Sequence, residues 1–176
     1  MSSKRIELPL SAEAAHDLRA GQECLLSGVM YTLRDAGHIR LLAELEERGS
    51  LPYGLAGQTL FYAGPTPPRD GRPFGAIGPT TASRMDFATP RLMDEGLMAT
   101  VGKGVRDERV REACIRNGGV YFVATGGAAA LLAQCIDAAE TIAYGDLGTE
   151  ALRRIEVTDF PVFVGIDVTG ASSYEL

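Results

Sequence analysis

Apolar and polar residues alternate along this chain with two periods, one typical of strands and one typical of helices. Residues 36–48 carry apolar side chains at helical spacing and are followed by Gly49, so an amphipathic helix is predicted to end there. Residues 97–101 form an apolar run that is typical of a buried parallel strand. Over the whole chain the same patterns predict helices at 11–19, 36–48, 106–117 and from Gly126 to about Cys135, and strands at 23–33, 59–63, 97–101, 120–124, 139–144, 152–157 and 161–168. Short connections rich in Gly or Pro separate these elements, which predicts one compact α/β unit.

The composition favours a single globular domain that covers residues 1–176. With 176 residues, of which 45% are hydrophobic, the chain can bury one sizeable core. The net charge is −6, Trp is absent and no basic run occurs, so nucleic acid is not expected as a partner. No apolar stretch is long enough to span a bilayer, and the first residues lack an apolar signal core. We therefore expect a cytoplasmic protein that does not bind membranes.

Cysteine and histidine are sparse, which bears on metal binding. Cys24, Cys114 and Cys135 show no CxxC spacing, and their odd number argues against a secreted disulfide framework. Scattered cysteines commonly behave as small core side chains, so no metal site is expected in this chain. His16 is expected on the surface, and only His38 lies near a motif.

The segment with the most chemical information is residues 78–86, with the sequence GPTTASRMD. Adjacent threonines after a proline suit the first turn of a helix, whose free N–H groups attract anions. On a helix, the guanidinium of Arg84 could reach the same side as the hydroxyls of Thr80 and Thr81. This arrangement predicts a site for a small carboxylate. A purely structural alternative is also open, in which a threonine only caps the helix and Arg84 only pairs with Asp86.

Three basic residues are predicted to fall at the ends of separate elements. Arg34 lies at a strand-to-helix junction, Arg84 lies in the turn of the 78–86 segment, and Lys103 follows a buried strand. Side chains at strand ends often form sites, because loops there are held by a rigid scaffold. Taken singly, each of the three would be a solvated surface charge. If the fold brings them together, they favour an anionic ligand.

Residues 78–86 resemble the GPTT-x-x-RM-D/E signature of the C-terminal domain, or separate β subunit, of class I fumarases and L-tartrate dehydratases. The resemblance continues in the same order over nearly the whole chain. The other matching segments are residues 27–28, 31–38, 61–65, 102–104, 117–121, 126–130, 147–151 and 156–161. One departure is Gly37, which stands where Ala is more usual.

This resemblance implies a swivelling β/β/α domain that takes part in the reversible hydration of fumarate to L-malate. It implies that Arg34, Arg84 and Lys103 bind the carboxylates of a C4 dicarboxylate. It also implies that Thr80 acts in proton transfer, as the base or as part of a relay, although a free Thr hydroxyl needs an activating neighbour. Thr81 either hydrogen-bonds the substrate or caps a helix.

The role of His38 has two interpretations. Its ordinary pKa suits acid–base catalysis, so it is a candidate catalytic residue that ranks below Thr80. It also lies one helical turn after Arg34 in the predicted helix, from where it could orient that side chain instead.

The resemblance further implies a [4Fe-4S] cluster in which one iron without a Cys ligand binds the substrate hydroxyl. Because this chain lacks a ligand set for it, the cluster is expected on a separate α subunit, with the site completed at the interface. Such docking would leave an apolar surface on the isolated chain, which could then form a homodimer.

Fumarate is preferred over tartrate as the substrate because residues 81–86, 126–130 and 156–161 look more similar to fumarases. The alternative within the family is an L(+)-tartrate dehydratase β subunit. An alternative of another class is a non-catalytic carboxylate-binding module, although the presence of Thr80, Arg84 and Lys103 argues against it.

Overall fold

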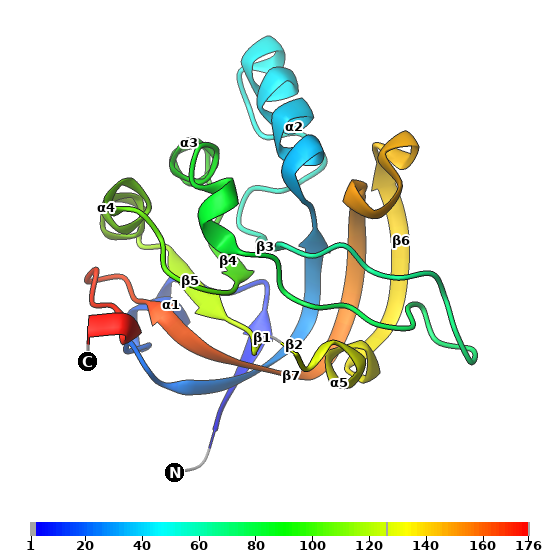
Figure 1. Cartoon of the computed structure of the whole chain (residues 1–176). Coiled ribbons are helices and arrows are strands. Elements are labelled where there is room, and N and C mark those ends of the chain that lie inside the picture. Colours follow the sequence, from blue (N-terminus) through cyan, green and yellow to red (C-terminus); the bar gives the residue numbers. More distant parts are fainter. Residues whose placement is uncertain (1–2, 126, 176) are drawn as a thin grey trace.

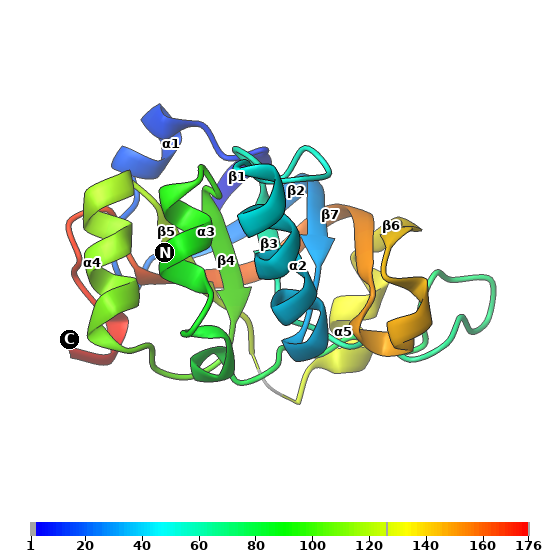
Figure 2. The same cartoon turned by 90° about the horizontal axis from the view of Figure 1, so that it is seen from above.

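The computed structural model describes residues 3–125 and 127–175 of the chain (Figure 1, Figure 2). In this part, the strands are β1 (Lys4–Leu8), β2 (Glu23–Thr32), β3 (Thr59–Phe61), β4 (Ala99–Gly102), β5 (Val120–Val123), β6 (Ile136–Ala143) and β7 (Leu152–Ile166). The α-helices are α1 (Ala12–His16), α2 (Asp35–Arg48), α3 (Thr89–Asp94), α4 (Glu108–Asn117) and α5 (Ala129–Gln134). Short 3-10 helices are η1 (Ala82–Met85), η2 (Gly145–Glu150) and η3 (Ser173–Glu175).

The strands form one sheet that closes on itself. Strands β2, β3, β4 and β5 lie side by side and parallel in that order. Strand β7 runs antiparallel to both β5 and β2 and thereby closes the ring, while β1 pairs with β2 and β6 pairs with β7. Helices α2, α3 and α4 lie next to one another on the outside of the ring (Figure 1, Figure 2). The predicted α/β unit is thus confirmed as a single domain with a mixed, closed sheet.

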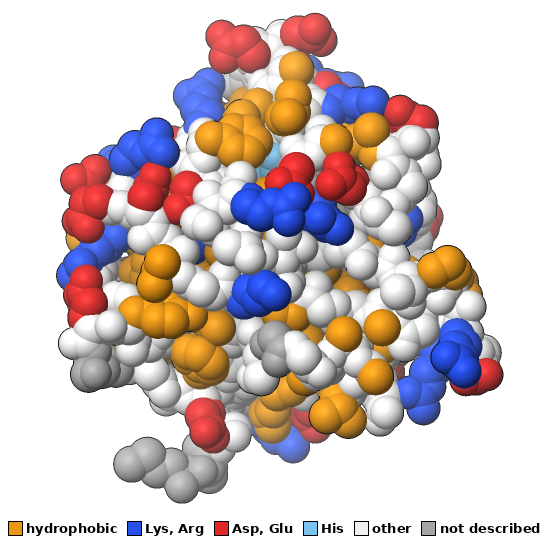
Figure 3. All heavy atoms as spheres, in the orientation of Figure 1, with side chains coloured by type: hydrophobic (Ala, Val, Ile, Leu, Met, Phe, Trp, Pro, Cys, Tyr) orange, Lys and Arg blue, Asp and Glu red, His pale blue; other side chains and the backbone are white. Residues whose placement is uncertain are grey.

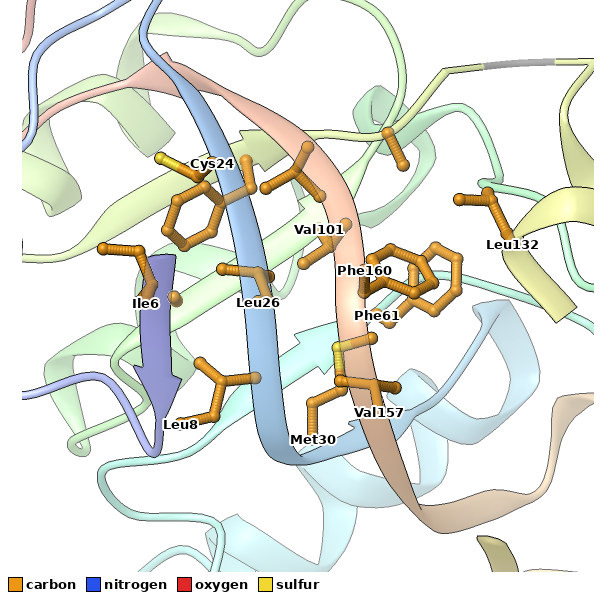
Figure 4. Close-up of a cluster of buried hydrophobic side chains, with 14 of the residues drawn as sticks. Ile6, Leu8, Cys24, Leu26, Met30, Phe61, Val101, Leu132, Val157 and Phe160 are labelled. Carbon is orange, nitrogen blue, oxygen red and sulfur yellow. The ribbon is translucent and has the colours of Figure 1, made fainter. Parts of the chain in front are cut away.

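The two faces of the sheet bury two separate apolar clusters. Phe61 of β3 packs edge-on against Phe160 of β7, with ring centroids 5.2 Å apart, in the first cluster, which also contains Leu26 (Figure 4). The flanking residues Leu60 and Tyr62 belong to the second cluster, which lies against α2, α3 and α4. Side chains along a strand point alternately to its two faces, so neighbouring residues at the end of β3 pack into different clusters.

The C-terminal strand differs from its prediction. Two strands were expected at residues 152–157 and 161–168, but β7 is continuous from Leu152 to Ile166. Its pairing with β2 shifts register between Leu26 and Gly28, and Asp159 has a φ of 51° at this irregularity. A β-bulge lets a strand bend without ending, so the break expected at residues 158–160 does not occur.

The helices agree with their predictions to different degrees. The helix predicted to end at Gly49 is confirmed as α2, and Gly49 closes it with a φ of 72°. Helix α3 was not predicted, whereas α5 begins at Ala129 and the predicted start at Gly126 lies outside the described residues. No helix in residues 3–125 or 127–175 is long and apolar enough to cross a membrane.

Candidate functional site

The residues singled out from the sequence lie at the carboxyl ends of β2, β3 and β4. Arg34 follows β2 and directly precedes α2, while Lys103 directly follows β4. Thr80 is paired with Tyr62, the residue directly after β3. Because neighbouring parallel strands end at the same edge of a sheet, the three chain segments meet there.

Backbone hydrogen bonds hold Thr80 between two strand ends. Its N–H donates to the carbonyl of Tyr62 at 2.7 Å, and its carbonyl accepts from the N–H of Lys103 at 3.2 Å. The next bond runs from Ala82 N to the Lys103 carbonyl at 2.8 Å. A Cβ on Gly102 would lie 2.9 Å from the Ala82 Cβ and 3.0 Å from a Tyr62 ring carbon, so only glycine lets the segment approach this closely.

The local structure after Thr80 differs from the expectation of a helix N-terminus. Thr80 and Thr81 precede η1, a four-residue 3-10 helix, and Thr81 makes no capping hydrogen bond with its side chain. The turn is therefore a short 3-10 helix in place of the expected helix start, and the expected cap by the Thr81 side chain is wrong. The physical reason is that the backbones of this segment are engaged by Tyr62 and Lys103. Thr80 is half-buried, and Thr81 is exposed.

Arg84 pairs with a residue that the sequence did not indicate. Its Nε and Nη2 both lie 2.9 Å from Oδ1 of Asp35, at the start of α2. The pair with Asp86 that the structural alternative proposed does not form, because Asp86 binds Arg106 instead. About half of the Arg84 side chain, 48%, is exposed. Figure 3 shows basic and acidic side chains next to one another in the middle of this face, below α2.

The guanidinium of Arg34 lies over a glycine. A Cβ on Gly64 would stand 2.6 Å from Nη1 and 3.0 Å from Cδ of Arg34. The Nε of Arg34 lies 3.6 Å from Oδ2 of Asp35 and 4.0 Å from Oε1 of Glu150. The other Glu150 oxygen accepts from the N–H of Ala36 at 3.1 Å, so this carboxylate also binds the N-terminus of α2. Arg34 is thus flanked by two carboxylates and a space that only glycine leaves open.

His38 is completely buried beneath these residues. Its Nδ1 lies 2.9 Å from the carbonyl oxygen of Arg34, and its ring packs edge-on against Tyr62 with centroids 5.3 Å apart. Burial lowers the pKa of His38 to about 4, so the ring is neutral at pH 7. Since a carbonyl only accepts, Nδ1 carries the proton. His38 therefore reaches the site through Arg34 and Tyr62.

The pKa of His38 predicts a pH dependence of stability. The unfolded chain binds a proton as the pH falls below the ordinary value of 6.5, but the folded chain binds it only near pH 4. The free energy of unfolding should therefore fall between these values, by about 3 kcal/mol from this residue. Urea unfolding of the wild type and of His38→Asn at pH 7 and pH 4.5 measures this contribution, with exposed His16→Asn as the control. Equal pH dependence in the wild type and His38→Asn would refute it.

A buried ionic network centred on Arg106 contacts the residues next to the site. The sequence analysis did not identify it. The fully buried Arg106 side chain donates from Nε to Asp86 at 2.6 Å and from Nη2 to Thr89 at 2.8 Å. Its guanidinium lies over the rings of Tyr62 and Tyr121, at 5.2 Å and 4.7 Å from their centroids. Because Asp86 directly follows η1 and Tyr62 binds Thr80, this network fixes both ends of the Thr80–Arg84 segment.

The cysteines lie apart, on β2, on α4 and directly after α5. Burial raises the pKa of Cys24 to about 11 and that of Cys114 to about 12, so these thiols stay protonated at pH 7. No group of three His, Cys, Asp or Glu residues suited to a metal ion occurs in the described part of the chain. An iron–sulfur cluster therefore does not fit the described cysteines.

A groove of about 510 Å³ is lined by other residues. It runs between the proline-rich loop at residues 65–74 and strand β6, and it reaches η2 at Gly148 and Thr149. None of the six candidate residues lines it. The candidate site is therefore the sheet edge that carries Arg34, Thr80 and Arg84.

Comparison with known proteins identifies the family. A sequence model described as "Fumarase C-terminus" matches residues 2–176. The "Fumarate hydratase 1, mitochondrial" of Leishmania major is 41% identical over 152 residues, which are 85% of this chain and 28% of that protein. The "Fumarate hydratase class I, anaerobic" of Escherichia coli (strain K12) is 39% identical with the same coverage.

A third relative is matched over most of its own length. The "L(+)-tartrate dehydratase subunit beta" of Escherichia coli (strain K12) is 32% identical over 172 residues, which are 95% of this chain and 84% of that protein. The chain thus spans about 28% of the length of the fumarate hydratases that it matches, but most of the β subunit. Because the family model covers residues 2–176, the chain belongs to the fumarase C-terminus family.

Proposed function

We propose that this chain supplies substrate-binding and proton-transfer residues to an iron–sulfur-dependent hydro-lyase that interconverts fumarate and L-malate. The observation that carries this proposal is the backbone pairing of Thr80 with Tyr62 and Lys103, at the sheet edge where Arg34 also lies. The fumarate hydratases among its relatives support the choice of reaction.

In this proposal Arg34, Arg84 and Lys103 bind the two carboxylates of the substrate. Guanidinium groups form paired, charge-assisted hydrogen bonds with carboxylates, and an ammonium adds a point charge. Removing a proton next to a carboxylate builds up negative charge, which fixed cations stabilise. The exposed Lys103 and half-exposed Arg84 are open to a ligand from the solvent side.

Thr80 is the residue that we assign to proton transfer. Its hydroxyl is a weak base, so a neighbouring base must activate it, and we place that group on the partner subunit. Thr81 is exposed and would hydrogen-bond the substrate. The complete burial of His38 favours an orienting role over direct acid–base catalysis.

The partner in this proposal is an α subunit that holds the [4Fe-4S] cluster. Three exposed apolar residues adjoin the site segments: Ile39 is 63% exposed, Phe87 47% and Val105 59%. We assign them to the contact with the α subunit, and an isolated chain could pair through them as a homodimer. The closed sheet with helices outside is compatible with a swivelling β/β/α domain, which we infer for this chain.

The tartrate dehydratase β subunit is the second candidate, and it is favoured because the match covers 84% of that protein. The test is to reconstitute the chain with a cluster-bearing α subunit and to compare fumarate, L-malate, mesaconate and the tartrate isomers. Highest kcat/KM with fumarate and malate is expected. Activity with tartrate alone would establish the second candidate. Carboxylate binding without activity, unchanged by Thr80→Ala, would indicate a non-catalytic module.

Gly64→Ala should weaken substrate binding without unfolding the domain. The new Cβ would occupy the space of the Arg34 guanidinium, which can move because it ends a flexible side chain. We expect KM to rise about 10-fold to 100-fold, because a displaced carboxylate clamp loses its alignment. The free energy of unfolding should change by less than about 0.5 kcal/mol. Gly145→Ala is the control, since the atom nearest to its added Cβ would lie 3.8 Å away. An equal KM for both variants would contradict this role of Gly64.

A further inference from the structure

Asp35 is a carboxylate placed among cations that we assign to substrate carboxylates. Its Oδ1 accepts from Arg84, and its Oδ2 faces Nε of Arg34 at 3.6 Å. A negative charge here would compete with an anionic substrate if charge alone mattered. The geometry of the two contacts indicates a different effect.

Asp35 occupies only one edge of the Arg84 guanidinium. Nε and Nη2 form the lateral edge of the group, and both point to the same Asp35 oxygen at 2.9 Å. The outer edge, made by Nη1 and the second hydrogen of Nη2, is left for another acceptor. A guanidinium has five N–H donors in a rigid plane, so it can bind two carboxylates on two edges. Asp35 can thus hold Arg84 without blocking a second carboxylate.

The other oxygen of Asp35 serves Arg34 through charge. Oδ2 of Asp35 and Nε of Arg34 are both buried, and neither has a hydrogen-bond partner within residues 3–125 and 127–175. At 3.6 Å they attract each other, and this attraction offsets the repulsion between two guanidinium groups held at one site. Asp35 also lies in the first turn of α2, where the helix dipole favours a negative charge.

We propose that Asp35 is a positioning residue that holds Arg84 by its lateral edge and keeps Arg34 beside it, so that both guanidinium groups are aligned before the substrate arrives. This inference rests on the proposed function, because it assigns the free outer edge of Arg84 to a substrate carboxylate. Asp35 itself does not touch the substrate.

The contact is tested first on the chain alone. In ¹⁵N NMR spectra, the Nε–H of Arg84 should give a distinct signal protected from exchange in the wild type and in Asp35→Asn, which keeps an acceptor oxygen. Asp35→Ala should lose this signal, while Glu47→Ala, which removes an exposed carboxylate of the same helix, should keep it. An Arg84 signal unchanged in Asp35→Ala would overturn the contact.

The role is tested in the reconstituted complex with fumarate and L-malate. Asp35→Ala should raise KM about 10-fold to 100-fold, the range for loss of a hydrogen bond between charged groups, with kcat changed far less. Asp35→Asn should restore part of the affinity, because it keeps the acceptor for Arg84 but loses the charge that faces Arg34, and Glu47→Ala should equal the wild type. A KM that is unchanged or lower in Asp35→Ala would overturn the inference, since removal of a negative charge alone predicts tighter binding.

Arg84→Ala separates this inference from the proposed function. If Arg84→Ala raises KM but Asp35→Ala does not, only the positioning role of Asp35 fails. If Arg84→Ala leaves KM unchanged, the carboxylate site itself is wrong, and the inference about Asp35 fails with it.

Discussion

Thr80→Ala should lower the turnover number of the reconstituted complex by about 100-fold to 10,000-fold, the range that a positioned proton-transfer group contributes. The KM should change little, because the cations that bind the carboxylates remain. The backbone of residue 80 is held by Tyr62 and Lys103 on both sides, so removal of the hydroxyl should leave the segment in place. The measurement is steady-state kinetics with fumarate and L-malate.

Two variants act as controls for this result. Thr80→Ser keeps a hydroxyl at the same position and should retain most of the turnover. Thr81→Ala removes the neighbouring, exposed hydroxyl and should alter KM more than kcat. Unchanged turnover in Thr80→Ala would reject the assignment of proton transfer to Thr80.

Arg106→Met should lower the free energy of unfolding by about 3–5 kcal/mol, because it leaves the carboxylate of Asp86 buried without its charged partner. Asp86 is 5% exposed, and the Arg106 side chain is fully buried. The loss also removes contacts with Thr89 and with the faces of Tyr62 and Tyr121. Urea unfolding of the isolated chain, followed by circular dichroism, measures the change.

The matched control is Arg109→Met, three residues further along the chain. Arg109 also forms an ion pair, with Asp107 at 2.6 Å, but 68% of its side chain is exposed. Water solvates such a pair in both folded and unfolded states, so its loss should change stability little. Similar losses of unfolding free energy in Arg106→Met and Arg109→Met would contradict the claim that burial makes the Arg106–Asp86 pair more stabilising.

The regular elements could be predicted because their signals are local. The apolar spacing before Gly49 specifies α2, and the apolar run at 97–101 overlaps β4, Ala99–Gly102. The continuity of β7 through residues 158–160 was missed because the bulge near Asp159 depends on pairing with a distant strand.

The candidate residues could be chosen from the sequence, but their partners could not. Arg84 binds Asp35, 49 positions earlier in the chain, and a local pattern cannot specify such a pair. The only protein partner that the sequence suggested was Asp86, two positions away and named in the structural alternative, which the fold buries against Arg106. Likewise, the need for glycine at position 64 arises only once Arg34 lies over it. Side-chain partners depend on how strand ends are brought together, which is a property of the whole sheet.

The most direct test of the carboxylate site is the position of a dicarboxylate in a crystal structure of the complex with its α subunit. The expected result is L-malate or fumarate with its carboxylates within hydrogen-bond distance of Arg34, Arg84 and Lys103, and with the Thr80 hydroxyl facing the carbon that loses a proton. A dicarboxylate bound beyond the reach of these side chains, for example in the groove beside residues 65–74, would contradict the proposal.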